Sequence, residues 1–474
     1  MQPPETTRPN ILYIMVDQAR ADLIGAGGHP ACPTPNLDAL ARQALVCTRA
    51  YCTAPMCTPA RGSILTGLYP ALNGANWNDA TPYRDVPLMG DLLRRGGYTA
   101  AWMGKWHLDG GFYMGYGRAD GGFAPRWWYD GQNWADDIGP EAYAQFKAYK
   151  RLPLDGKKTS ALPREDCWAT RVADRAISFL ETRQPADEPW MLGISFDEPH
   201  QPHMAPPECY ETIDVSACEL ASNINAPLEG KPTAQQDRRA GCVNSEEDIR
   251  RFMHSYFACM MYVDQEIGRV LERVGDDTVV VFTSDHGEMM ASHGQWSKPH
   301  HFYEESIRVP LLLRVPGKTA CEETDALVSH LDILPTLLDL SGAPRPEALH
   351  GRSLLALTDA TADEWRDRLL VAFDRGGCRR NDRNPERRLS GRATGGFYPQ
   401  RCLIEPTQKL VVNLFDTDEH YDLRQDPGEM SNRLARGSGT PAQVDMLERL
   451  VDEMAAHNDP LLSQAWRNRP WSTS

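Results

Sequence analysis

Apolar runs of strand length alternate with segments of helical spacing along the first 340 residues of the chain. This alternation is typical of an α/β fold, in which a mostly parallel sheet is covered by helices. The apolar runs predict strands at residues 10–16, 99–103, 190–196, 278–284 and 309–314. The helical spacing predicts helices at residues 35–45, 85–95, 168–183, 246–274 and 333–340.

The pattern changes at about residue 365. Short apolar runs joined by turn residues predict strands at residues 369–373, 400–404, 409–415 and 420–423. Helical spacing returns at residues 442–456, so we expect a small antiparallel sheet with one helix. The sequence therefore predicts an N-terminal α/β domain (residues 1–364) and a C-terminal α+β subdomain (residues 365–474).

The charge balance excludes one class of partner. The 474 residues include 65 acidic and 50 basic side chains, which gives a net charge of −15. A field of this sign repels phosphate chains, so we expect no nucleic-acid partner. An anionic substrate would need a local cluster of cations to bind against that field.

No apolar stretch reaches 18 residues, so we expect neither a membrane span nor a membrane partner. The first ten residues lack the basic and apolar regions of a signal peptide. This predicts a cytoplasmic protein, or a periplasmic one if a leader has been removed. The twelve cysteines include no Cys-x-x-Cys pair. We therefore expect most of them to be reduced thiols. Nothing in the sequence predicts an oligomeric state.

Residues 375–401 form a basic segment in this acidic chain, with eight arginines against Asp382 and Glu386. Such a charge run is usually a solvated surface loop. The alternative is a loop that attracts an anionic ligand.

Polar residues follow several predicted strands. Asp17 and Gln18 follow the first strand, and Asp285 and His286 follow the strand at 278–284. Because ligands bind beyond the carboxyl ends of parallel strands, these four side chains could converge on one divalent cation. Their oxygen atoms favour Ca²⁺, Mg²⁺ or Mn²⁺, and the imidazole nitrogen shifts the balance towards a transition metal. Each pair alone is weak evidence, because an aspartate at a strand end is often a turn former or helix cap.

Cys57 precedes a predicted helix whose first turn contains Pro59. Backbone amides at the start of that helix, together with Arg61, would stabilise an anion and lower the pKa of the thiol. These residues alone therefore predict a reactive thiol beside an anion site.

The run Cys57-Thr58-Pro59-Ala60-Arg61 resembles the signature of the type I sulfatases, a branch of the alkaline phosphatase superfamily. The flanking sequence strengthens the match, and the resemblance extends over essentially the whole chain. Its other motifs lie at residues 9–11, 34–38, 104–107, 283–288, 303–310, 421–423 and 426–429. The resemblance implies an enzyme that hydrolyses sulfate esters on an alkaline-phosphatase-like fold.

The resemblance also implies a role for each matching residue. Cys57 would be oxidised to formylglycine by a formylglycine-generating enzyme during maturation, and the hydrated aldehyde would attack sulfur and then expel sulfate. Asp285 would help to deprotonate the attacking hydroxyl, and His107 would deprotonate the second hydroxyl. The remaining residues would hold the sulfuryl group or protonate the leaving oxygen, namely Arg61, Lys105, His200 and Lys298.

The implied metal ligands are Asp17, Gln18, Asp285, His286 and the side chain at position 57. Many family members have a second aspartate where Gln18 stands and an asparagine where His286 stands. Both alternatives occur within the superfamily, so we expect an intact site. Ca²⁺ is the first choice of ion, and Mn²⁺ or Mg²⁺ the second.

Residues 105–110, 197–200, 395–402 and 469–471 resemble those of bacterial carbohydrate sulfatases. This narrower likeness implies a small sulfated substrate, with a 6-sulfated hexose or N-acetylhexosamine as the expected class. The segment 395–401 would overhang the mouth of the active site, and Asp109, Trp77, Asn78 and Arg401 would line the pocket beyond the sulfate. The alternative for Asp109 is a cap on the turn that contains Gly110.

Two other functions remain open at this point. An enzyme that hydrolyses a phosphonate monoester or phosphodiester would use the same arrangement of metal ion and formylglycine. A catalytically silent binding protein would lack catalytic residues, and every residue of the implied set is present.

Overall fold

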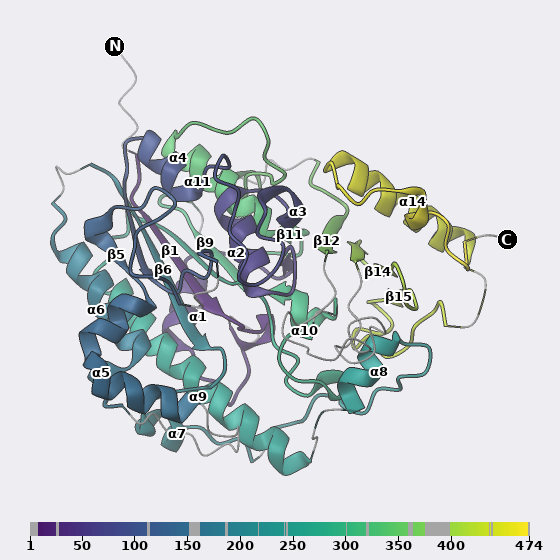
Figure 1. Ribbon diagram of the computed structural model, residues 1–474, viewed down its shortest axis with the longest axis horizontal. Coiled ribbons are helices and arrows are strands. Elements are labelled where there is room, and N and C mark those ends of the chain that lie inside the picture. The colour runs from purple at the N-terminus through teal and green to yellow at the C-terminus, as the bar shows by residue number, and fades with distance from the viewer. Residues whose placement is uncertain are drawn as a thin grey trace.

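The computed structural model describes residues 8–24, 28–110, 114–150, 162–184, 188–216, 218–240, 242, 245–299, 301–318, 322–358, 364–374, 399–435, 437 and 439–472. Within them, a large sheet flanked by helices lies beside a smaller C-terminal sheet (Figure 1). The predicted fold class is confirmed.

The large sheet has eight strands in the order β10-β2-β9-β7-β1-β6-β4-β5. Its centre is β1 (Ile11–Asp17), which pairs in parallel with β6 (Trp190–Pro199) on one side and β7 (Val279–Ser284) on the other. Strands β4 (Thr99–Gly104) and β5 (Trp128–Tyr129) continue the parallel order beyond β6. Strand β9 (Leu311–Arg314) is antiparallel to β7 and to β2 (Leu45–Cys47), and β10 (Glu322–Thr324) is parallel to β2.

Strand β1 is apolar up to its last residue, Asp17, because helices cover both of its faces. Leu12, Ile14 and Val16 belong to one core with α6 (Trp168–Glu181) and α9 (Glu246–Leu271). The alternate residues Ile11, Tyr13 and Met15 belong to a second core on the other face. The helices of that second core are α2 (Cys57–Thr66), α4 (Met89–Arg95) and α11 (Ile333–Ser341), and the two groups lie on opposite sides of the sheet in Figure 1.

Three predicted boundaries differ from the structure. The helix predicted at 85–95 starts only at Met89, because Pro87 precedes it and the carboxylate of Asp91 accepts a hydrogen bond from the backbone amide of Leu88. The helix predicted at 35–45 is α1 (Pro35–Ala41), after which the chain enters β2. Pro310 divides the strand predicted at 309–314 into β8 (Arg308–Val309) and β9, which belong to different sheets. Strand β8 pairs with β3 (Ala50–Tyr51), which also pairs with β11 (Val328–Ser329).

The C-terminal sheet has the antiparallel order β12 (Leu369–Phe373), β13 (Gln400–Ile404), β14 (Gln408–Asn413) and β15 (Glu419–Asp422). Helix α14 (Pro441–Ala456) begins with a capping box of Thr440 and Gln443 and packs on this sheet. Alternate residues of β12 belong to different cores, because Val371 packs with the main core and Leu370 with the α14 core. The division into two domains at 364/365 stays a prediction.

Six further α-helices lie in the described residues. They are α3 (Pro70–Asn73), α5 (Gly131–Lys150), α7 (Pro207–Thr212), α8 (Thr233–Ala240), α10 (Glu304–Ile307) and α12 (Leu355–Thr358). None of the helices in the described ranges is long and apolar enough to cross a bilayer.

Candidate active site

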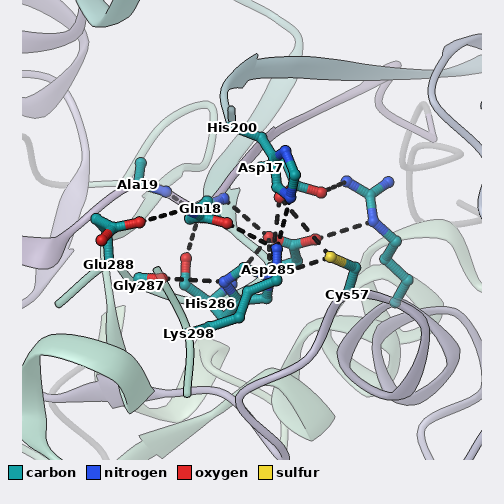
Figure 2. A network of polar contacts seen from close by, with 12 residues as sticks. Asp17, Gln18, Ala19, Cys57, His200, Asp285, His286, Gly287, Glu288 and Lys298 are labelled. Carbon is teal, nitrogen blue, oxygen red and sulfur yellow. Dashed lines mark hydrogen bonds and ion pairs between the residues drawn. The ribbon is translucent and has the colours of Figure 1, made fainter. Parts of the chain in front are cut away.

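The carboxyl ends of four parallel strands bring the predicted polar residues together. Asp17 is the last residue of β1, Asp285 follows β7, Lys105 follows β4, and Asp197 lies near the end of β6. All four are buried. Nζ of Lys105 donates a hydrogen bond to the carboxylate of Asp17 and another to the carboxylate of Asp197. Figure 2 shows the resulting network of polar contacts around Asp17 and Asp285.

Cys57 is the first residue of α2, so its side chain lies at the helix N-terminus. Its Sγ atom lies 3.2 Å from Nε2 of His286 and 3.8 Å from Oδ1 of Asp17. Burial, and then the charge of Asp17, raise the pKa of the thiol to about 12. The predicted lowering of this pKa is therefore wrong. The guanidinium of Arg61 is directed at the two aspartates rather than at sulfur.

Four ligand atoms converge at this point. One atom each from Asp17, Cys57, Asp285 and His286 lies within 4.8 Å of the others, and all four residues are buried. Nδ1 of His286 lies 3.0 Å from the carbonyl oxygen of Gly287. We assign the proton to Nδ1, because a carbonyl only accepts, and this leaves the Nε2 lone pair directed at the cluster.

The charges of the cluster suit a bound cation. Burial would raise the pKa of Asp17, but Lys105 and its other cationic neighbours hold that pKa well below its usual range. Burial, and then the charge of Asp17, raise the pKa of Asp285 to about 7. Two carboxylates close enough for their like charges to repel, together with a neutral imidazole, form a donor set that fits a divalent metal ion. The residues present therefore fit the implied metal.

Hydrogen bonds from Arg61 and Lys105 fix the positions of the cluster's carboxylates: Arg61 donates to both Asp17 and Asp285, and Lys105 donates to Asp17. Arg61 donates from Nε to Oδ2 of Asp285 at 2.9 Å and from Nη2 to Oδ2 of Asp17 at 3.0 Å. Lys105 donates from Nζ to the same Oδ2 of Asp17 at 2.7 Å and to Oδ1 of Asp197 at 2.8 Å. Because both cations use the Oδ2 atoms, the Oδ1 atoms of the two aspartates are left to face Cys57 and His286.

Lys298 joins His200 to Gln18, as the dashed lines in Figure 2 show. Its Nζ lies 2.6 Å from Nε2 of His200 and 2.7 Å from Oε1 of Gln18. His200 Nδ1 lies 2.7 Å from the carbonyl oxygen of Gln201, which assigns the ring proton to Nδ1. Burial, and then Lys298, hold the pKa of His200 well below its usual range, so the ring is neutral and Nε2 accepts from Lys298.

Gln18 has a left-handed backbone, with φ of 70°. Its backbone amide donates to Oδ1 of Asp285 at 3.1 Å, and its side-chain Nε2 donates to Oε2 of Glu288. These contacts orient the amide so that Oε1 accepts from Lys298. The role of Gln18 as a metal ligand stays a prediction.

His107 is buried behind Cys57 and has a φ of 62°. Its carbonyl oxygen accepts from Oγ1 of Thr58, the second residue of α2, at 2.8 Å. Burial, and then the charge of Lys105, hold the pKa of its imidazole well below the usual range. The ring is therefore neutral.

The four residues predicted to line the substrate pocket differ in their surroundings. Asn78 accepts from the backbone amide of Thr58 at 3.1 Å and so supports the turn that carries Cys57. The ring of Trp77 lies 5.9 Å from that of Phe373. Burial raises the pKa of Asp109 to about 6, and its buried Oδ1 has no hydrogen-bond partner among the described residues.

The structure does not support the prediction that Arg401 lines the substrate pocket. Its side chain is fully buried and forms ion pairs with Asp374 and Asp459, and its guanidinium lies over the ring of Trp466. These partners belong to the C-terminal part of the chain, so the structure gives this arginine a packing role. Residues 375–398 of the basic segment 375–401 lie outside the described residues. They include residues 395–398 of the segment 395–401 that was predicted to overhang the site.

Three residues of the network were missed as site residues. Oγ of Ser195 accepts from Nη1 of Arg61 at 2.8 Å, but a serine inside an apolar strand gives no signal in the sequence. Asp197 and Glu288 lie in the segments 197–200 and 283–288, which drew attention only through their histidines and Asp285. Their position beside strand-end residues was the signal that could have identified them.

Comparison with known proteins agrees with this geometry. The sequence profile of the sulfatase family matches residues 9–343. The chain is 32% identical over 469 residues to the uncharacterized sulfatase YidJ of Escherichia coli, covering 98% of this chain and 90% of that protein. It is 31% identical over 369 residues to the ulvan-active sulfatase of Formosa agariphila, covering 75% of this chain and 66% of that protein. The crystal structure of the phosphonate monoester hydrolase of Agrobacterium radiobacter superposes with a TM-score of 0.78 at 25% identity, covering 95% of this chain and 96% of the other.

Proposed function

The chain belongs to the sulfatase family and is an enzyme that hydrolyses sulfate esters, and we propose that its substrate is the sulfate ester of a sugar, such as a 6-sulfated hexose or N-acetylhexosamine. The observation that carries the catalytic part is the convergence of ligand atoms from Asp17, Cys57, Asp285 and His286 beside Arg61 and Lys105. The sugar part is supported by the carbohydrate-sulfatase motifs and by the similarity to the ulvan-active enzyme.

Two groups that the family uses would complete this site. A divalent cation, with Ca²⁺ as first choice, would be held by Asp17, Gln18, Asp285 and His286, and would supply a Lewis acid that draws charge from the nucleophile and the sulfuryl oxygens. Formylglycine made from Cys57 would supply the hydrated aldehyde, in which one hydroxyl would attack sulfur and the second, once deprotonated, would expel sulfate.

The residues of the chain then position the sulfuryl group and move protons. Arg61 and Lys105 would hold its oxygens, and they would overcome the net charge of −15 because contacts in a buried site are far stronger than the diffuse field. Since His200 is neutral, Lys298 carries the proton between them and delivers it towards the leaving oxygen. Neutral His107 accepts the proton that must leave the side chain at position 57 before sulfate departs.

The experiment that tests the reaction class is a panel of nitrophenyl esters that differ only in the group attacked. Nitrophenyl sulfate should give a larger kcat/KM than a nitrophenyl phosphonate monoester or phosphodiester, measured with protein in which peptide mass shows formylglycine at position 57. Conversion of the cysteine side chain lowers that mass by about 18 Da, and hydration restores it. Phosphonate hydrolysis is the second candidate function, because the superposition with the Agrobacterium enzyme favours it. A larger kcat/KM for the phosphonate ester would assign the chain to that class.

The sugar assignment predicts a preference for hydroxyl-bearing substrates. A 6-sulfated hexose or N-acetylhexosamine should exceed an aryl sulfate of equal leaving-group pKa by about tenfold or more in kcat/KM, since buried polar groups stay unpaired when the ligand lacks hydroxyls. Asp109→Ala should reduce this ratio to about threefold or less, because Oδ1 of Asp109 is a buried acceptor without a partner among the described residues.

Asp85→Ala, at an exposed aspartate, serves as the matched control and should keep the sugar preference. Equal or faster turnover of the aryl ester by the unaltered enzyme would contradict the sugar assignment. A ratio unchanged in Asp109→Ala would show that this carboxylate only caps its turn.

A further inference from the structure

A cavity opens beside the leaving-group side of the active site, and nothing in the mechanism above uses it. The space between its walls, counted together with the open solvent at its mouth, is about 420 Å³. Asp197 and His200 line it and also belong to the catalytic network, through Lys105 and Lys298. The cavity therefore shares two of its lining residues with the network that would hold the sulfuryl group.

The walls of this cavity are aromatic and rich in sulfur. Trp134, at 1% exposure, stands nearly perpendicular to two other rings that line the cavity. Its ring centroid lies 5.4 Å from that of Trp168 at 78° and 4.8 Å from that of Phe146 at 89°. Met114 and Met204 add two polarisable thioethers. Such rings and thioethers present negative charge density to a bound group.

One wall carries a carboxyl group, one of whose oxygen atoms has no hydrogen-bond partner among the described residues. Glu198 is 6% exposed, and its Oε2 has no hydrogen-bond partner among the described residues. Burial, and then the charge of Asp197, raise the pKa of Glu198 to about 8, while a hydrogen bond from the backbone of Ala169 lowers it. No lysine or arginine lines the cavity, so no cation of the described chain neutralises this carboxylate there. A buried carboxyl group in this situation gains from a positively charged partner.

We propose that this cavity binds an organic cation, an ammonium or alkylated ammonium group, carried by the alcohol part of the sulfate ester. The sulfate end of such a substrate faces Arg61, Lys105 and Lys298, and its positive end faces Glu198 and the rings of Trp134 and Trp168. A bound cation would favour the ionised form of the Glu198 carboxyl, and the two ends of the site would then have opposite charge, which selects a zwitterionic ester. This inference rests on the proposed sulfate ester hydrolysis. An amino sugar as the leaving alcohol would narrow the sugar proposal, and an amino alcohol would replace it.

Two kinds of alcohol carry this chemistry, and matched pairs of substrates distinguish them. The first pair is choline O-sulfate and its uncharged isostere 3,3-dimethylbutyl sulfate. The second pair is glucosamine 6-sulfate and glucose 6-sulfate. In at least one pair the cationic member should have a kcat/KM about tenfold or more above the neutral member, as expected for a desolvated cation on aromatic rings with a carboxylate. The pair that shows the difference identifies the source.

Glu198→Gln keeps the shape of the side chain and removes its charge, so it should reduce the ratio within the responsive pair to about threefold or less. Trp134→Leu should reduce the same ratio and provides a second variant if Glu198→Gln fails to fold. Glu208→Gln is the matched control, because Glu208 is an exposed glutamate on the neighbouring helix α7 and should leave the ratio unchanged.

Binding is measured separately from turnover by calorimetric titration with tetramethylammonium chloride. The unaltered protein should bind it, and Glu198→Gln should bind at least about tenfold more weakly. Turnover of nitrophenyl sulfate without a cation preference in either pair would overturn this inference alone. Absence of turnover on every sulfate ester, with formylglycine present, would overturn the proposed function instead.

Discussion

Cys57→Ala is expected to abolish hydrolysis of every sulfate ester, lowering kcat by at least about a thousandfold. The side chain at position 57 is the one that contacts both His286 and Asp17 at the centre of the cluster. With a thiol pKa raised to about 12, an unmodified Cys57 would be protonated and a poor nucleophile at neutral pH. The chemistry is therefore expected to depend on the oxidised residue. Initial rates with nitrophenyl sulfate measure the loss.

Cys57→Ser should be almost as inactive, because a single hydroxyl can accept the sulfuryl group but cannot expel it. Both variants should keep the fold, since the change removes or replaces one small atom, and circular dichroism with the thermal midpoint checks this. Cys47→Ala, at a buried cysteine of β2, is the matched control and should retain activity. Retention of more than a few per cent of activity by either Cys57 variant would contradict a formylglycine mechanism.

The arrangement of the strands was predictable because β1, β6 and β7 are covered on both faces, so each begins as an apolar run and polar residues appear only towards its end. Residues at the ends of such runs must gather at one edge of the sheet, whatever their separation in sequence. This is why Asp17 and Asp285, 268 positions apart, could be placed together from the chain alone. The C-terminal strands were found for a related reason, because turn residues separate each short apolar run.

Contacts within the site depended on orientations that no local pattern encodes. The thiol pKa was predicted in the wrong direction, because burial and Asp17 outweigh the helix N-terminus and Arg61 turns to the carboxylates. Arg401 was expected at a pocket, but it pairs with Asp459, 58 positions away. The cavity at Trp134 was not foreseen at all. Its walls come from α5, α6 and the chain after β6, and only tertiary packing brings them together.

Removal of the metal is expected to inactivate the enzyme, and one divalent ion should restore it. Asp285→Asn should lower both the bound metal and kcat, the latter by at least about a hundredfold, because it removes one of only two charged ligands in the described cluster. Asp17→Asn should act in the same way. Elemental analysis of the purified protein, run beside the rate assay, measures the metal directly and does not depend on turnover.

The Asp197→Asn variant distinguishes the effect of losing a metal ligand from the effect of losing a buried negative charge. Asp197 is a buried aspartate at the same sheet edge, but its contact is with Nζ of Lys105 at 2.8 Å, and it is not one of the four converging ligands. This variant should therefore lower kcat by weakening the hold on Lys105 while it keeps a full complement of metal. Equal metal content in Asp285→Asn and Asp197→Asn would contradict the ligand assignment. A fully active sample without any cation would contradict the requirement for metal, because Asp285 and Asp17 would then act only as partners of Arg61.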